Sequence, residues 1–178
     1  MIAKILLAVI ASSALPVAQA DDRTFDFDCD APEGHFTSWS ASTTAAALTI
    51  TGDLRIHELR LDKKWYALLS VMIYGGADGK TKFGFRAYDI DQTQKKLHLD
   101  LLKPGGHIDF GNDALKPGKK SVPFKLELSA TGTLSVDVGG AQQSAELGVF
   151  KPRSVDFGCS TPGDFSFDDI RITERAAP

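Results

Sequence analysis

Apolar and polar residues alternate along most of the chain. Between Ala46 and His57 every second position favours an apolar side chain, and the same alternation returns over residues 66–74, 83–88 and 97–101. A period of two places successive side chains on opposite faces of an extended strand. These segments are therefore predicted to be β-strands with one apolar face and one polar face.

The last third of the chain continues the pattern. Strands are predicted over residues 122–128, 134–138, 142–149, 154–159 and 165–173, separated by turn sequences such as Thr131-Gly132 and Gly139-Gly140. No helical periodicity follows residue 20. About ten to twelve short strands with regular turn signals are typical of a sandwich or barrel. We predict an all-β fold, a two-sheet antiparallel β-sandwich.

The first twenty residues have a different character. Lys4 precedes an apolar run, Ile5–Ile10. The segment ends in Ala18-Gln19-Ala20, which has small residues at the two positions that a signal peptidase recognises. This order predicts a secretory signal peptide over residues 1–20, the alternative being a retained N-terminal anchor. Residues 21–178 would then form a single β-sandwich domain with no membrane span, in the periplasm or outside the cell.

Charge and cysteine content narrow the function classes. The formal net charge is −3, without a segment that concentrates Lys and Arg, which argues against nucleic acid and against a membrane-surface helix. The two cysteines, Cys29 and Cys159, predict one disulfide in an oxidising compartment. Separate thiols or a metal pair are the alternatives.

The polar faces of the central strands carry the candidate binding chemistry. If these strands are neighbours, they display together Arg55, His57, Tyr66, Ser70, Tyr74, Arg86, Tyr88, His98 and Asp100. Aromatic rings pack on the apolar faces of sugars, and Arg, Asp and His form hydrogen bonds with hydroxyl groups. The alternative is that these residues are cross-strand pairs that only stabilise the sheet.

The C-terminal third resembles a known superfamily. The hairpin over residues 122–140 and the final sequence Phe167-Asp168-Asp169-Ile170-Arg171-Ile172 are similar to the closing strands of concanavalin A-like (laminin G-like) jelly rolls. This superfamily includes lectins, glycan-binding modules, protein-binding modules and glucanases. The resemblance implies a jelly-roll architecture, and we expect a ligand to bind on the concave polar face of the sandwich.

The glucanase signature of that superfamily is absent from this sequence. It places Glu-x-Asp-x-Glu or Glu-x-Asp-x-x-Glu on one strand, so that two carboxylates flank the sugar. The nearest pair, Glu58 and Asp62, has the wrong spacing. We therefore expect a non-catalytic member of the superfamily, not an enzyme.

Calcium is the one cofactor that the sequence suggests. Asp28 near the N-terminus and Asp168 and Asp169 near the C-terminus would come together if the disulfide forms, and carboxylate oxygens are ligands for calcium. The alternative is that such residues are the outward positions of a charged edge strand.

We expect the first of three functions, and the other two are its alternatives. The first is a carbohydrate-binding module with a glycan as its partner. The second is a protein–protein or envelope interaction domain. The third is a glycoside hydrolase without the usual motif.

Overall fold

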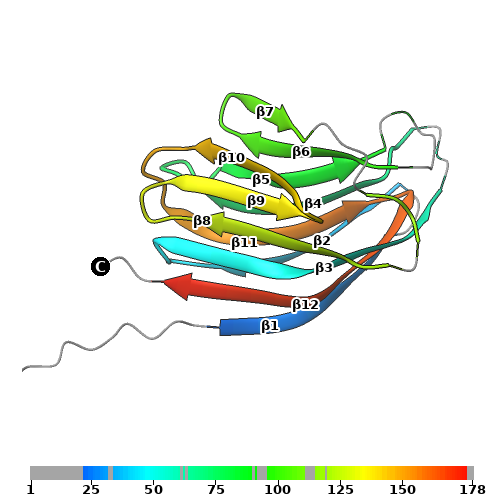
Figure 1. Cartoon of the computed structure of the whole chain (residues 1–178), viewed down its shortest axis with the longest axis horizontal. Coiled ribbons are helices and arrows are strands. Elements are labelled where there is room, and N and C mark those ends of the chain that lie inside the picture. The colour runs from blue at the N-terminus through cyan, green and yellow to red at the C-terminus, as the bar shows by residue number, and fades with distance from the viewer. Residues whose placement is uncertain are drawn as a thin grey trace, which may run out of the picture.

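The computed structural model describes residues 22–31, 34–60, 62, 64–89, 91, 96–110, 115–118 and 120–175. Within them lie strands and no helix (Figure 1). The strands are β1 (Asp22–Asp30), β2 (Phe36–Ser42), β3 (Ala47–Leu59), β4 (Leu68–Gly75), β5 (Thr81–Tyr88), β6 (His98–Lys103), β7 (Gly106–Asp109), β8 (Val122–Leu128), β9 (Thr133–Val138), β10 (Ala141–Glu146), β11 (Pro152–Ser160) and β12 (Gly163–Arg175).

These strands form two six-stranded sheets that pack face to face. Sheet A has the order β1-β12-β3-β8-β9-β10, and sheet B has the order β2-β11-β4-β5-β6-β7. Every ladder is antiparallel. The predicted all-β, two-sheet antiparallel sandwich is confirmed.

The connections explain how the polar faces are distributed. The chain alternates between the sheets over β1, β2 and β3, and then β4 to β7 follow one another as neighbours in sheet B. Strands β8 to β10 do the same in sheet A. Residues on β4, β5 and β6 therefore share one sheet, whereas β3 lies in the other.

Inward-facing rings hold the sheets together. Phe124 on β8 of sheet A lies 5.6 Å from Phe85 and 6.5 Å from Phe157 of sheet B, measured between ring centroids. Phe167 on β12 meets Phe157 edge-on at 5.4 Å. Burial of each large side chain contributes about 1.5–3 kcal/mol, so this aromatic layer is a main source of stability.

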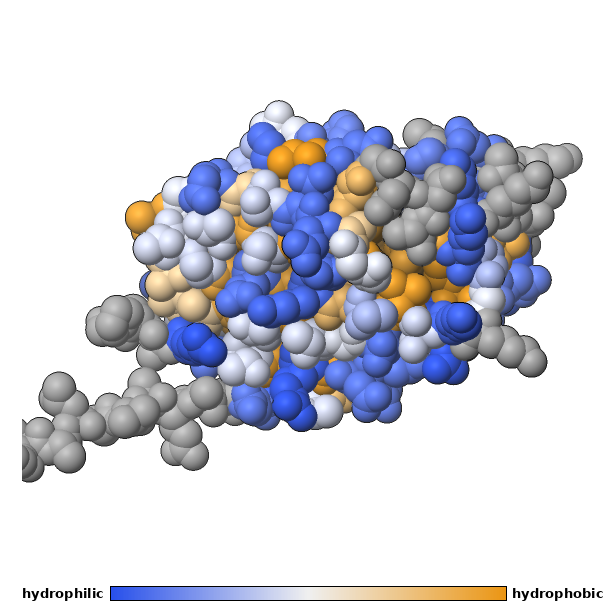
Figure 2. Space-filling view, viewed as in Figure 1, coloured by the Kyte–Doolittle hydropathy of each residue, from blue (hydrophilic) through white to orange (hydrophobic). Residues whose placement is uncertain are grey.

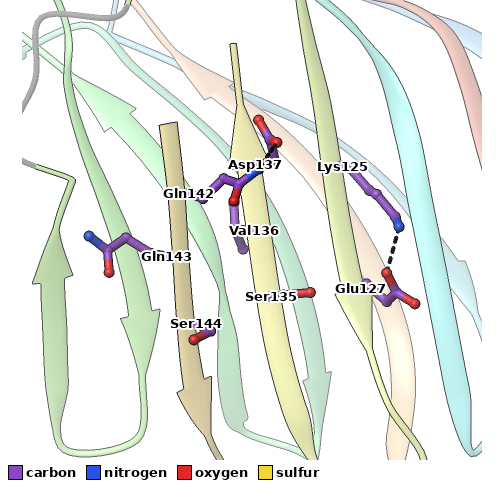
Figure 3. A pocket seen from close by; sticks show the side chains of 8 residues that line it. All are labelled: Lys125, Glu127, Ser135, Val136, Asp137, Gln142, Gln143 and Ser144. Carbon is purple, nitrogen blue, oxygen red and sulfur yellow. Dashed lines mark hydrogen bonds and ion pairs between the residues drawn. The ribbon is translucent and has the colours of Figure 1, made fainter. Parts of the chain in front are cut away.

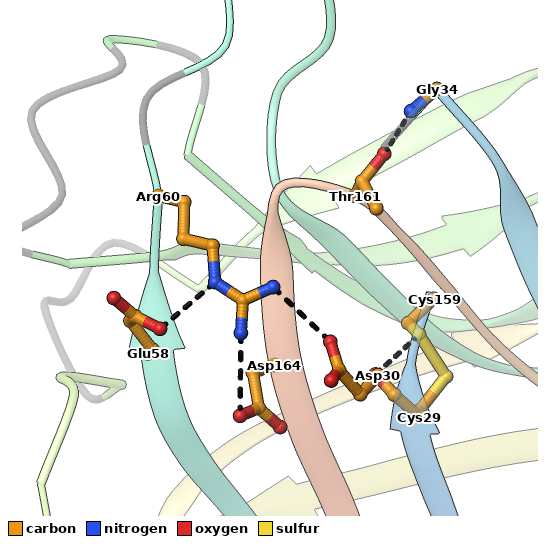
Figure 4. Close-up of polar contacts among 8 residues, drawn as sticks. All are labelled: Cys29, Asp30, Gly34, Glu58, Arg60, Cys159, Thr161 and Asp164. Atoms are coloured by element: carbon orange, nitrogen blue, oxygen red, sulfur yellow. Dashed lines mark hydrogen bonds and ion pairs between the residues drawn. A yellow bond between two sulfur atoms is a disulfide. The ribbon is translucent and has the colours of Figure 1, made fainter. Parts of the chain in front are cut away.

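A disulfide and an ion-pair network close one end of the sandwich (Figure 4). Cys29 on β1 is bonded to Cys159 on β11, so the predicted disulfide is confirmed and it joins the two sheets. Arg60 contacts Glu58 at 2.8 Å, Asp30 at 3.2 Å and Asp164 at 3.6 Å. Hydrogen bonds to Glu58 and then Asp30 raise the pKa of Arg60, while burial raises the pKa of Asp164.

Two strands were not predicted from the sequence. Pro104-Gly105, a dipeptide equally typical of a break in the chain, is the tight turn of a hairpin in which Lys103 on β6 pairs with Gly106 on β7. Strand β2 pairs along β11 from Phe36 to Ser42. It escaped prediction because its small and hydroxylated residues resemble a loop.

The proposed signal peptide, residues 1–20, lies outside the described residues. The described part of the chain contains no helix that is long and apolar enough to cross a membrane.

Candidate functional site

The outer face of sheet B brings most of the predicted ligand-binding residues together. Arg86 on β5 lies opposite Asp100 on β6, and Tyr88 lies opposite His98. Tyr66 precedes β4, and its ring centroid lies 6.1 Å from that of Tyr88. We call Tyr66, Arg86, Tyr88, His98 and Asp100 the tyrosine cluster.

Asp100 is the centre of this cluster. Its side chain is 3% exposed, and its Oδ2 accepts hydrogen bonds from Arg86 Nη2 at 3.0 Å and from the Tyr88 hydroxyl at 2.9 Å. The Arg86 guanidinium carbon also lies 4.8 Å from the centroid of the Tyr88 ring. A buried carboxylate requires such partners, and here they fix the orientation of both neighbouring side chains.

Exposed rings border the cluster. Tyr66 is 42% exposed and its neighbour Trp65 is 50% exposed. On the other side of Tyr88, the His98 ring lies 6.1 Å away, centroid to centroid, and its Nε2 lies 3.2 Å from Asp91 Oδ2. The cluster therefore combines a fixed polar centre with accessible aromatic surface.

The Tyr88 hydroxyl remains a donor over the neutral pH range. Burial is the largest cause that raises the pKa of Tyr88, followed by its hydrogen bond to Asp100, while Arg86 acts in the opposite direction. The protonated phenol is the form that donates to Asp100.

Arg55 and His57 do not belong to this face, which corrects the prediction of one common surface. They lie on β3 in sheet A, where β3 pairs with β12 and β8. Arg55 Nη2 lies 3.6 Å from Asp168 Oδ2, and His57 Nε2 lies 3.1 Å from Ser166 Oγ. The physical reason is that the chain crosses to sheet B after Leu59, so alternation alone could not relate β3 to β4.

Tyr74 and Ser70 do lie on the outer face of sheet B, on β4. Ser70 is opposite Arg86, whereas Tyr74 is opposite Lys82 and Ser154, farther along the strands. Burial and, secondly, the charge of Asp156 raise the pKa of Tyr74. Tyr74 therefore belongs to a separate part of the same face.

The calcium candidates do not form a metal centre. Asp168 is paired with Arg55, and Asp28 lies opposite Ser166. The backbone N–H of Asp169 donates to Asp26 Oδ1 at 2.7 Å, with a left-handed φ of 50° at Asp169. Among the residues whose positions are described, no three His, Cys, Asp or Glu side chains gather as metal ligands.

An open groove of about 450 Å³ lies on the outer face of sheet A, over β8, β9 and β10 (Figure 3). Polar side chains line it, among them Lys125, Glu127, Asp137 and Gln142. Lys125 Nζ lies 2.6 Å from Glu127 Oε2, with both side chains about half exposed at 52% and 43%. Figure 2 shows the side of the molecule that carries sheet A, and this side is covered mostly by hydrophilic residues.

Some residues near the candidate site were not predicted to bind ligand. Asp91, whose Oδ2 lies 3.2 Å from His98 Nε2, is one of them. Phe36 on β2 is 59% exposed, and Asp156 on β11 lies on the same outer face. The alternation of Ser38-Trp39-Ser40-Ala41 was the signal that could have identified this strand.

No protein-family model matches the chain, and no curated protein matches it. Solved structures do match. An alginate lyase of Pseudomonas aeruginosa is 13% identical over 74% of this chain and 66% of its own, with a TM-score of 0.54. A PL7 alginate lyase of Zobellia galactanivorans is 14% identical over 78% of this chain and 65% of its own, with a TM-score of 0.56.

A third similar structure is the carbohydrate recognition domain of Emp46p in its metal-free form. It is 12% identical over 89% of this chain and 88% of its own, with a TM-score of 0.56. By contrast, the chain spans just under two thirds of the two alginate lyases, 66% and 65%. At these identities the likeness establishes the fold alone, a jelly-roll β-sandwich.

Proposed function

We propose that this protein is an exported, non-catalytic carbohydrate-binding module that holds a glycan on the outer face of sheet B, at the tyrosine cluster. The observation that carries the proposal is the buried Asp100, which fixes Arg86 and Tyr88 beside exposed aromatic rings. The jelly-roll fold shared with a carbohydrate recognition domain supports it.

The cluster has the two kinds of surface that a sugar ring requires. Tyr66 and Trp65 offer exposed ring faces for packing against C–H groups. Arg86 uses Nε and Nη2 toward Asp100 at 3.4 and 3.0 Å, and within the described residues its Nη1 has no protein partner. That nitrogen is a donor for a sugar hydroxyl.

Preorganisation is the energetic reason to favour this site. A side chain that must be ordered on binding costs about 0.5–1.5 kcal/mol. Arg86 and Tyr88 are already ordered by Asp100 in the free protein. Binding at this face therefore avoids a cost that exposed, unpaired side chains would incur.

The same geometry favours binding over hydrolysis. Asp109 on β7 lies opposite Asp100 on β6, so two carboxylates are neighbours on this face, as a glycosidase would need. However, Asp100 Oδ2 is engaged by both Arg86 and Tyr88, and the side chain is almost fully buried. A carboxylate held in this way acts as a structural acceptor, not as a nucleophile or proton donor.

Export is part of the proposal. The predicted signal peptide over residues 1–20 and the Cys29–Cys159 disulfide both fit an oxidising compartment, either the periplasm or the cell exterior.

A glycan-array screen of the oxidised protein over residues 21–178, with and without calcium, tests the function. We expect binding to glycans that Arg86→Ala and Tyr88→Ala abolish and that Lys125→Ala, on the other sheet, leaves unchanged. A calcium requirement would direct attention to the acidic ends of the chain. Binding that survives both tyrosine-cluster variants, or turnover of any glycan on the array, would contradict the proposal.

A further inference from the structure

A second hollow lies on the outer face of sheet B, away from the tyrosine cluster. It has a volume of about 60 Å³ and is bounded by Phe36 on β2, Asp156 on β11 and Tyr74 on β4. Its floor includes Gly158 and Met72. The function proposed above does not use it.

A glycine forms the base of this hollow. Gly158 occupies a position on the outer face of β11. A Cβ atom placed on it would lie 2.4 Å from Cζ of Phe36. The edge of the Phe36 ring therefore rests directly over the backbone of β11, while the side chain remains 59% exposed. Phe36 therefore presents an accessible ring at a fixed position beside polar groups, and a sugar ring can pack against such a ring.

The polar groups around Phe36 can accept and donate hydrogen bonds. Asp156 Oδ1 accepts from Ser40 Oγ at 2.6 Å, and among the described residues Asp156 Oδ2 has no hydrogen-bond partner. Tyr74 contributes a hydroxyl, and burial followed by the charge of Asp156 raises its pKa, so it stays protonated. A ring face, a carboxylate oxygen and a phenol together match the needs of one sugar unit.

Strand register connects this hollow to the tyrosine cluster. Phe36 lies opposite Ser160, Ser160 opposite Leu68, and Leu68 opposite Tyr88. Phe36 and Tyr88 are thus in one cross-strand row, separated by three strand spacings, or about 14 Å. A ligand that touches both must be longer than a single sugar.

The charges on this face favour an uncharged ligand. Asp100, Asp109 and Asp156 lie on its strands, with Asp91 at its border, against the cations Lys82 and Arg86. Arg86 is already neutralised by Asp100. A polyuronate, with a carboxylate on each unit, would meet the like charge of Asp156 at the second hollow.

We infer that Phe36, Tyr74 and Asp156 form a second subsite, and that the ligand is a neutral glycan chain lying across the strands from the tyrosine cluster to Phe36. This inference rests on the proposed function and extends it by giving the ligand a length and a charge. It assigns Phe36 the role of a stacking platform for a distal sugar unit.

Calorimetric titration with size series of neutral gluco-, manno- and galacto-oligosaccharides, from single sugars to hexamers, tests the inference. We expect wild-type affinity to rise with chain length. Phe36→Ala should weaken hexamer binding about tenfold, since one ring contact is lost, and leave single sugars unaffected. Phe36→Tyr, which keeps the ring, should bind as the wild type does.

An alginate hexamer in the same titration tests whether the ligand is neutral. It should bind more weakly than the best neutral hexamer, and the opposite order would overturn the neutral assignment. Equal effects of Phe36→Ala on single sugars and hexamers, or no effect on either, would overturn the second subsite.

The outcomes separate this inference from the proposed function. If Tyr88→Ala abolishes all binding and Phe36→Ala changes nothing, the proposed function stands and the second subsite is wrong. If Phe36→Ala abolishes binding and Tyr88→Ala has no effect, the tyrosine cluster is not the primary site. If no neutral series binds but alginate or another charged glycan of the array does, the inference is wrong and the proposed function stands. If no glycan of either kind binds, both are contradicted.

Discussion

The two outer faces of the sandwich each carry an ion pair between neighbouring positions, but the pairs have different surroundings. On sheet B the Asp100 side chain is 3% exposed and the Arg86 side chain 28% exposed, with Tyr88 bonded to the same carboxylate oxygen. On sheet A the Lys125 and Glu127 side chains are 52% and 43% exposed. Only the first pair is shielded from water and held by a third group.

The groove on sheet A is for the same reason a weaker candidate site than the tyrosine cluster. Apart from Val136, the groove of about 450 Å³ on sheet A is lined by charged, amide and hydroxyl residues, with no aromatic ring among its lining residues. Water satisfies such groups equally well, so a ligand gains little there. The tyrosine cluster offers both packing surface and ordered donors.

Removal of the disulfide should have the largest effect on stability. Cys29→Ala combined with Cys159→Ala should lower the free energy of unfolding by about 2–5 kcal/mol, because the bond links strands far apart in the sequence. Since it joins the two sheets, both faces should lose stability together. Urea unfolding followed by Trp fluorescence measures the change, and an unchanged midpoint would show that the sheets do not depend on this link.

Loss of the buried Asp100 carboxylate should have the second largest effect on the free energy of unfolding. Asp100→Ala leaves the Arg86 guanidinium and the Tyr88 hydroxyl without their acceptor. We expect a loss of about 2–3 kcal/mol, at the lower end for a buried pair because Arg86 is partly exposed. The same urea experiment measures it, and Asp100→Asn, which keeps the shape and an acceptor oxygen, should lose less. If Asp100→Ala lowered the free energy of unfolding as little as removal of an exposed ion pair does, the pairs on the two faces would be energetically alike.

Removal of the Tyr88 hydroxyl tests the contribution of Tyr88 to the Arg86–Asp100 pair. Tyr88→Phe keeps the ring and deletes the hydrogen bond to Asp100, so it should cost about 1–2 kcal/mol. Tyr66→Phe is the matched control, because Tyr66 belongs to the same tyrosine cluster. An equal loss in both variants would mean that the Asp100 bond has no special role.

Alkaline pH should reveal the same bond. The pKa of Tyr88 is raised above its ordinary value near 10, so the folded state favours the protonated phenol. Its contribution to stability is present below about pH 10 and is lost as pH rises through the folded-state pKa. Tyrosinate absorbance should therefore show a late-titrating group that Tyr88→Phe removes. Between neutral and strongly alkaline pH that variant should lose less stability than the wild type, and an equal loss would contradict the assignment.

The smallest effect belongs to the exposed pair on sheet A. Glu127→Ala should lower the free energy of unfolding by about 0.2–1 kcal/mol and leave glycan binding unchanged. A loss comparable to that of Asp100→Ala, or a loss of binding, would move the functional site to the groove on sheet A.

Local patterns predicted the strands well because their signals are local. The β8–β9 hairpin follows from alternation on either side of Thr131-Gly132, and the β9–β10 turn from Gly139-Gly140. The disulfide followed from the two cysteines and the predicted export. The β6–β7 hairpin was missed because Pro104-Gly105 is equally typical of a chain break.

Placement of the site depended on information that alternation does not contain. Arg86, Tyr88, His98 and Asp100 were grouped correctly because β5 and β6 are sequential neighbours. Arg55 and His57 were grouped wrongly because β3 pairs with β12 and β8, one of them more than a hundred residues away. Long-range pairing of this kind is set by the whole fold and not by any single segment.

Mapping of amide chemical shifts by NMR tests the central claim most directly. A ¹⁵N-labelled sample would be titrated with the neutral hexamer that binds most tightly, and the shifts of both sheets would be followed together. We predict changes on β4, β5 and β6, extending to β2 and β11, with β8, β9 and β10 unaffected. Changes confined to β8, β9 and β10 would contradict the account and place the ligand in the groove on sheet A.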